Sequence, residues 1–102
     1  MKIPKRVKIG ADDIRVKFKN TVKCADGESV LGISKGSVGR IEIAKKFNGE
    51  NVTESTIADT FLHEIFHILN ANMGINLKER QVAGIAGGLL MVIRDNDLDF
   101  RK

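Results

Sequence analysis

Polar and apolar residues alternate along the front half of the chain, in the pattern of short β-strands. Period-two alternation covers residues 6–9 and 14–19, and residues 30–33 and 40–44 are again rich in apolar side chains. Successive side chains of a strand point to opposite faces of a sheet, so this pattern predicts strands with one buried and one solvated face. The front half therefore predicts a small, mainly antiparallel sheet of three to four strands.

Two turn signals separate the predicted strands. Residues 24–29, with the sequence CADGES, contain an Asp-Gly pair. Residues 34–39, with the sequence SKGSVG, contain Gly36 and Gly39, which suit a loop with positive φ. Both signals favour hairpin-like connections over long crossovers.

The back half changes to a helical period. Apolar residues recur at i, i+3 and i+4 between Ile57 and Leu69, and this stripe predicts a helix over residues 54–73. Thr53 is suited to the N-cap, and Gly74 is suited to the C-terminal stop. The fold class predicted by the whole pattern is α+β, with the sheet packed on this helix and on the one that follows it.

A second apolar stripe, from Val82 to Ile93, predicts another helix that begins after residues 75–77, with Asn76 as its N-cap, and ends near Asp95. Its interior contains three glycines: Gly84, Gly87 and Gly88. Each glycine costs about 1 kcal/mol relative to alanine. Their i, i+3, i+4 spacing predicts a smooth strip along which another helix or strand approaches closely.

Composition narrows the class of protein. The chain has 102 residues, 42% of them hydrophobic and 29% charged, which is the balance of one globular domain over residues 1–102. We expect no secretory signal and no membrane span, because no apolar run approaches the required length. Cys24 is the single cysteine, so no internal disulfide forms. The expected location is the cytoplasm.

A net charge of +4 raises the question of nucleic-acid binding. Eight of the seventeen lysines and arginines fall within the first 23 residues. Arg15, Lys17 and Lys19, however, alternate with apolar residues, as the solvated face of a strand does. Aromatic residues for base stacking are not interleaved with them, so the pattern favours a solvated face over a nucleic-acid surface.

The first predicted helix contains both histidines of the chain, in the sequence HEIFH at residues 63–67. Side chains four residues apart lie on one face of a helix, so His63 and His67 can converge on one metal ion. Glu64 lies at the edge of that face, where it can activate a metal-bound water. The pattern is HExxH and predicts zinc-assisted hydrolysis of an amide. The alternative is an ordinary amphipathic helix with two histidines on its polar face.

A catalytic zinc site of this type needs a third protein ligand. The three-histidine pattern HExxHxxGxxH is excluded, because Asn70 and Met73 occupy its glycine and histidine positions. Asp59 lies on a further turn of the same helix, and a straight helix cannot aim three successive turns at one point.

The second predicted helix supplies the remaining carboxylates. If the two helices are antiparallel, Glu79 lies beside the last turns of the first, whereas Asp95, Asp97 and Asp99 lie at the far end. Glu79 is therefore the predicted third ligand. The alternative role for Glu79 is a capping box with Asn76, to which it has the Asn-x-x-Glu spacing.

These residues resemble a known family. The sequence HEIFH followed by LKERQVAGIAGGLLMVI is similar to HExxH…E metallopeptidases of the gluzincin type. The closest resemblance is to small zincin-like proteins of phages and prophages, and a more distant one is to ImmA/IrrE-type peptidase domains. It covers residues 54–97, and over the front half it extends only to the order of strands.

The resemblance implies one zinc ion per chain, held by His63, His67 and Glu79, with Glu64 as general base and acid. It also implies a protein or peptide substrate, bound by strand addition along an exposed strand within residues 30–44. A phage or prophage protein of this kind acts in the host cytoplasm. The family association with cleavage of repressor proteins makes a regulatory substrate conceivable.

The chain departs from many gluzincins in having no tyrosine and no third histidine to stabilise the oxyanion. Four other polar residues are candidates for that role: Asn70, Asn72, Arg80 and Arg94. Because of this departure and the basic front half, a non-enzymatic function is the alternative to a peptidase. In it, the protein is a non-catalytic module that binds a protein or nucleic-acid partner, and its binding does not depend on Glu64. The sequence does not determine the oligomeric state.

Overall fold

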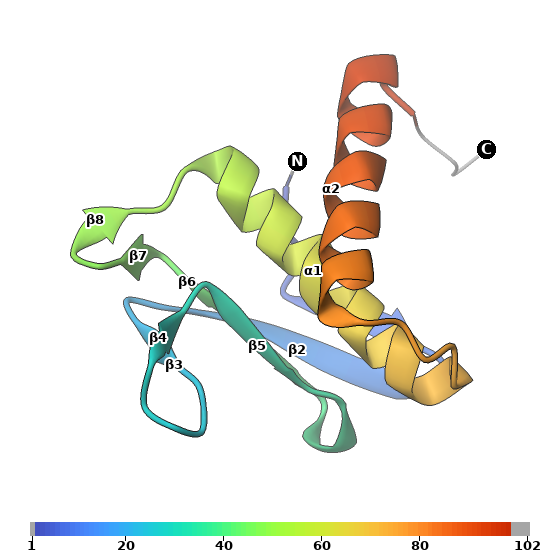
Figure 1. Ribbon diagram of the computed structural model, residues 1–102, viewed down its shortest axis with the longest axis horizontal. Helices are drawn as coiled ribbons and strands as arrows, with labels where there is room; N and C mark the ends of the chain where they lie inside the picture. Colours follow the sequence, from blue (N-terminus) through green and yellow to red (C-terminus); the bar gives the residue numbers. More distant parts are fainter. Residues whose placement is uncertain (1, 99–102) are drawn as a thin grey trace.

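In a computed structural model, which describes residues 2–98, a four-stranded sheet lies on one side of a long helix and a second helix lies on the other (Figure 1). The long helix, α1, spans Glu54–Met73, and the second helix, α2, spans Glu79–Asn96. This arrangement confirms the predicted α+β fold. No helix among the described residues is long and apolar enough to cross a membrane.

The sheet contains β1 (Arg6–Ile9), β2 (Asp12–Lys19), β5 (Gly32–Lys35) and β6 (Arg40–Ala44). Its strand order is β1-β2-β6-β5, so β5 forms one edge. The β1–β2 and β5–β6 pairs are antiparallel, as predicted, whereas β2 and β6 run parallel. The parallel pair arises because the chain leaves the sheet after β2 and re-enters it through the β5–β6 hairpin.

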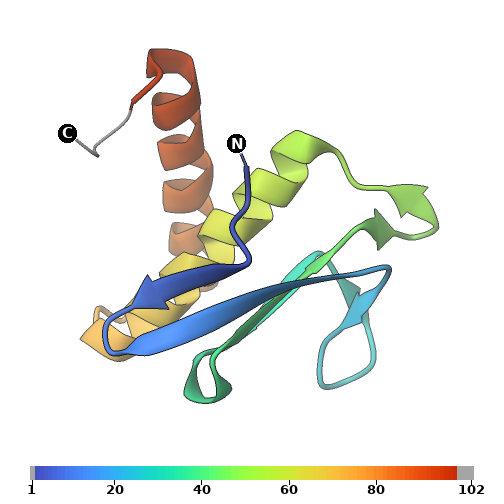
Figure 2. The same ribbon diagram turned by 180° about the vertical axis from the view of Figure 1, so that it is seen from behind.

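Short elements connect these strands. The first connection contains the two-stranded pair β3 (Val22–Lys23) and β4 (Ser29–Val30), which encloses the predicted Asp-Gly turn. A single turn of 3-10 helix, η1 (Gly36–Val38), joins β5 to β6. After β6, the pair β7 (Lys46–Phe47) and β8 (Glu50–Asn51) leads into α1. Figure 2 shows both small ribbons at one end of the molecule, beyond the main sheet.

The core lies between the sheet and α1. It consists of apolar residues from four elements: Ile9, Ile14, Val16, Ile41, Ile43, Phe61 and Ile68. The predicted alternation along β2 is confirmed by buried Ile14 and Val16 and by exposed Arg15 and Lys17. Phe18 continues the buried side in sequence but is 40% exposed, one residue before the strand ends.

Helix α1 has the predicted limits. The Thr53 side chain accepts a hydrogen bond from the Thr56 backbone N–H, which satisfies one of the free donors of the first turn. Gly74 ends the helix at a φ of 62°, in the left-handed region where a residue without Cβ is favoured. The amphipathic stripe and both caps therefore specify α1 fully.

Helix α2 begins later than predicted. Lys78 is its N-cap, and the Lys78 backbone N–H donates to Oε1 of Gln81 at 2.8 Å. The prediction of Asn76 as N-cap is wrong, because Asn76 has a φ of 66°, whereas an N-cap residue needs an extended backbone. The last residue of α2, Asn96, lies one position beyond the predicted end.

Only one of the three α2 glycines lies at a close approach. A Cβ on Gly87 would lie 3.6 Å from Oδ1 of Asp59 on α1, whereas one on Gly84 or Gly88 would meet nothing within 4 Å. The predicted continuous glycine strip is therefore wrong. The three glycines lie on one side of the helix, whereas α1 covers mainly another side, which contains Val82 and Ala86, both buried.

Candidate metal centre

The two histidines of α1 face the same side of the helix, as their spacing predicts. Their Nε2 atoms are 3.0 Å apart, and their ring centroids are 4.7 Å apart. The side chain of His63 is 19% exposed and that of His67 is 31% exposed, so both rings are partly shielded from solvent. Two imidazole nitrogens at this distance can share one proton in a hydrogen bond, or both can give their lone pairs to one cation.

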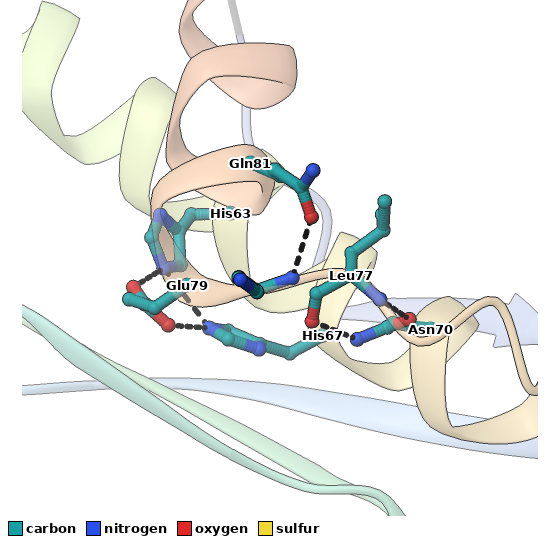
Figure 3. Close-up of polar contacts among 7 residues, drawn as sticks. His63, His67, Asn70, Leu77, Glu79 and Gln81 are labelled. Carbon is teal, nitrogen blue, oxygen red and sulfur yellow. Dashed lines mark hydrogen bonds and ion pairs between the residues drawn. The ribbon is translucent and has the colours of Figure 1, made fainter.

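Glu79 completes a group of three. It is the first residue of α2, and its carboxylate spans the two rings (Figure 3). Oε1 lies 2.6 Å from Nε2 of His63, and Oε2 lies 2.8 Å from Nε2 of His67. The alternative role as a capping-box residue is excluded by geometry, because Gln81, three residues after Lys78, makes that contact.

The donor set fits a zinc ion. The ligand atoms of His63, His67 and Glu79 all lie within 4.8 Å of one another. In a tetrahedral site with bonds of about 2.0–2.2 Å, ligand atoms are roughly 3.3 Å apart. Small outward movements of the three side chains therefore open the required space. Two imidazoles and one carboxylate are also the ligands of many hydrolytic zinc sites, which keep one position for water.

Two hydrogen bonds from Asn70 of α1, called the Asn70 clasp below, hold the start of α2 beside the histidines. Asn70 lies one turn after His67 and binds the backbone of Leu77 twice (Figure 3). Its amide donates to the Leu77 carbonyl at 3.1 Å, and its Oδ1 accepts the Leu77 N–H at 2.8 Å. Because Leu77 precedes Glu79 by two residues, these bonds fix where Glu79 enters the site.

Replacing Asn70 with alanine is expected to lower both stability and zinc affinity. Two hydrogen bonds at about 0.5–1.5 kcal/mol each give a loss of about 1–3 kcal/mol in the free energy of unfolding. Zinc affinity falls with it, because Glu79 is no longer held in place. Urea unfolding and a competitive zinc titration measure the two effects. An unchanged zinc affinity in a folded Asn70→Ala protein would show that the clasp does not position Glu79.

Glu64 is buried in the sheet-facing side of α1 with only 6% of its surface exposed. This burial raises the pKa of Glu64 above its usual value, because a carboxylate loses hydration there. A hydrogen bond with the Ser34 side chain opposes the shift, as do nearby His67 and His63, whereas Glu79 adds to it. A carboxyl group with a raised pKa holds its proton to a higher pH than an exposed glutamate does, which suits it to proton transfer.

A cavity of about 530 Å³ opens between α1 and the edge of the sheet. Residues 30–34 form one wall. The other wall comes from α1 and contains Asp59 and Thr60. These two residues lie beside His63, His67 and Glu79, which are called the metal-binding group below. Glu64 lines the same cavity, so all four residues predicted from the HExxH…E pattern line one cavity.

Gly32 lets β5 approach this part of α1. A Cβ at that position would lie 2.5 Å from Cγ2 of Thr60, 3.1 Å from the Glu42 carbonyl and 3.5 Å from Cγ of Glu64. The first distance is far below ordinary contact, and the second atom belongs to the rigid backbone of β6. Only a residue without a side chain therefore allows β5 to pack this closely against α1 beside the cavity.

Replacing Gly32 with alanine is expected to push β5 away from α1. Overpacking of this kind costs about 1–3 kcal/mol in the free energy of unfolding. Thermal unfolding of Gly32→Ala measures the cost. Gly88→Ala is a matched control away from the cavity, since a Cβ there meets nothing within 4 Å and the backbone of Gly88 is helical. Equal destabilisation by both substitutions would contradict a packing role for Gly32.

The other polar residues considered for the site lie elsewhere. Asp95 and Asp97 are at the far end of α2, as predicted, and Asp99 lies outside the described residues. The oxyanion candidates Asn70, Asn72, Arg80 and Arg94 do not line the cavity. Asn70 is engaged by Leu77, and Arg94 pairs with its neighbour Asp95.

Sequence reasoning missed three contributors to the site: Ser34, Asp59 as a wall residue, and the Asn70 clasp. Ser34 lies thirty residues from Glu64, so no local pattern connects the two. The clasp has a weak signal, because an asparagine one turn after the second histidine faces the loop before Glu79.

Comparisons with known proteins add no family to this description. No protein-family model matches the chain, and no match was found among curated proteins or solved structures. The argument about function therefore depends on the geometry of the site and on the chemistry of its residues.

Proposed function

We propose that the protein is a zinc-dependent peptidase that hydrolyses peptide bonds of a protein or peptide substrate. The observation that carries the proposal is the convergence of His63, His67 and Glu79 beside buried Glu64 in a cavity at the sheet edge. A merely structural histidine pair needs no buried carboxyl group next to it. The combination of three ligands and one shielded acid is typical of metal-assisted hydrolysis.

Each residue has a distinct role in this proposal. Zinc, when bound, acts as a Lewis acid that activates water and polarises the scissile carbonyl. His63, His67 and Glu79 hold the ion through two nitrogens and a carboxylate. Glu64 takes a proton from the attacking water and delivers it to the leaving amine. The Ser34 side chain, hydrogen-bonded to Glu64, keeps the carboxyl group oriented into the cavity.

The edge strand β5 provides a surface for the substrate. Among residues 2–98 it pairs only with β6 in this sheet, so its other side has backbone N–H and C=O groups available to an extended peptide. Residues 32–34 of β5 border the cavity, whereas residues 40–44 form β6, an interior strand. The range of 30–44 considered for strand addition therefore narrows to β5 and the residues just before it.

Metal content and chelation test the proposal. Purified protein is expected to contain about one zinc per chain by elemental analysis. It is expected to cleave an unfolded protein or a peptide library, to lose that activity on chelation, and to regain it with added zinc. Retained zinc without any hydrolysis over a broad library would instead favour a non-catalytic zinc-bearing module. A protein that retains no zinc would contradict the proposal altogether.

A further inference from the structure

We propose that Asp59 is a positioning residue, whose carboxylate accepts a hydrogen bond from Nδ1–H of His63 when the metal is bound. The inference rests on the proposed zinc site and adds a residue that is not a ligand. Asp59 lies one helical turn before His63 on α1, and both side chains line the same cavity. Side chains four residues apart on a helix are neighbours.

The first observation is an unsatisfied acceptor. Oδ1 of Asp59 is buried and has no hydrogen-bond partner among the described residues. Leaving a buried acceptor unpaired costs about 1–3 kcal/mol, so such an atom calls for an explanation. Helix α2 supplies no donor there, because the residue that faces Oδ1 is Gly87, which has no side chain. The space left by Gly87 accommodates the carboxylate without satisfying it.

The second observation is the orientation of the His63 ring. Its Nε2 points toward Glu79 and the centre of the metal-binding group (Figure 3). Its other nitrogen, Nδ1, has no hydrogen-bond partner among the described residues. A side chain on a helix leans toward the N-terminus, so the ring of His63 leans over the turn that contains Asp59.

Metal binding connects the two unpaired groups. A neutral imidazole that gives the lone pair of Nε2 to a metal carries its proton on Nδ1. The donor that Asp59 lacks is thus present whenever zinc occupies the site. Metal-bound histidines commonly donate this second N–H to a carboxylate, which fixes the tautomer and makes the ring a stronger ligand. Asp59 is the acidic residue one turn before His63 on α1, and it is neither a proposed ligand nor the proposed base.

Zinc affinity and stability of Asp59 variants test the inference. Asp59→Ala is expected to weaken zinc binding about 10- to 100-fold in competition with a chromophoric chelator. Asp59→Asn is expected to retain part of the affinity, because its amide oxygen still accepts a hydrogen bond. Neither substitution is expected to destabilise the metal-free protein, since the carboxylate oxygen has no partner there. Glu54→Gln, which removes one charge from the first turn of α1, is the control and is expected to leave zinc affinity unchanged.

Nuclear magnetic resonance gives a second readout. In the zinc-loaded protein, the Nδ1 proton of His63 is expected to resonate downfield and exchange slowly, and Asp59→Ala is expected to abolish both properties. Equal zinc affinity in wild type and Asp59→Ala would overturn the inference and leave the proposed zinc site intact. So would lower stability of metal-free Asp59→Ala with unchanged zinc affinity, which would indicate a packing role. A wild-type protein that binds no zinc would overturn both.

Discussion

Replacing Glu64 with glutamine is expected to abolish peptide hydrolysis while the protein keeps its zinc. The amide has nearly the same shape as the carboxyl group but cannot take a proton from the attacking water. Loss of a general base lowers turnover by about 100- to 10,000-fold. Single-turnover hydrolysis of a peptide substrate, with zinc content measured on the same sample, checks the result.

The same substitution is expected to stabilise the metal-free protein at neutral pH. Burial raises the pKa of Glu64, so the folded state binds this proton more tightly than the unfolded state. The stability of the wild type therefore decreases as pH rises through the interval between the unfolded and folded pKa values. Glu64→Gln removes this decrease, so its gain in stability is present at neutral pH and fades as the solution becomes acidic. Chemical unfolding at a series of pH values measures the difference.

Glu42 provides a matched control, because it is also a glutamate with 6% exposure. Its carboxylate pairs with Nζ of Lys19 at 3.2 Å and with Nε of Arg40 at 2.9 Å. Glu42→Gln is therefore expected to lower stability and to retain hydrolysis. If Glu64→Gln cleaved peptides as fast as wild type, Glu64 would not be the base, and the proposed mechanism would be wrong.

Replacing Glu79 with alanine is expected to weaken zinc binding by about a hundredfold or more. Structural zinc sites with four ligands gain roughly 10–16 kcal/mol, or roughly 3 kcal/mol per ligand, and each 1.4 kcal/mol is a factor of ten. The effect on folding is expected to be small, since the Glu79 side chain is 67% exposed. In the metal-free protein Glu79 contributes its exposed contacts with the two histidine rings and a favourable charge at the start of α2, the charge being worth about 0.3–1 kcal/mol. Isothermal zinc titration with parallel thermal unfolding separates the two effects.

Glu50 serves as the comparison for Glu79. It is an exposed glutamate on β8 and lies outside the metal-binding group. Glu50→Ala is expected to bind zinc like wild type. A Glu79→Ala protein with wild-type zinc affinity would show that the ion has a different third ligand, and the two-helix site would have to be abandoned.

The sequence predicts α1 and the metal-binding group well, for physical reasons. An uninterrupted apolar stripe, the Thr53 cap and the Gly74 stop all act within a few residues, so α1 follows from local rules alone. His63 and His67 then share a face through helix geometry. Glu79 follows from the short loop between the helices, which returns the start of α2 to the side of α1.

Features that depend on distant contacts were predicted less well. The expected N-cap at Asn76 is wrong because Asn70 binds the backbone of Leu77, and Asn76 lies in a loop with positive φ before α2 begins. Only Gly87 of the three glycines faces α1, which depends on the rotation of α2 about its axis. The parallel pairing of β2 with β6 and the contact of Ser34 with Glu64 connect segments more than twenty residues apart. Local periodicity has no information about such pairs.

The first coordination shell of zinc tests the central claim most directly. A crystal structure of the zinc-loaded protein is expected to show one ion per chain, bound to Nε2 of His63, Nε2 of His67 and the carboxylate of Glu79. The fourth position is expected to hold a water molecule within hydrogen-bonding distance of Glu64. An ion bound to other residues, or no ion retained at these three side chains in zinc-saturated protein, would contradict the account.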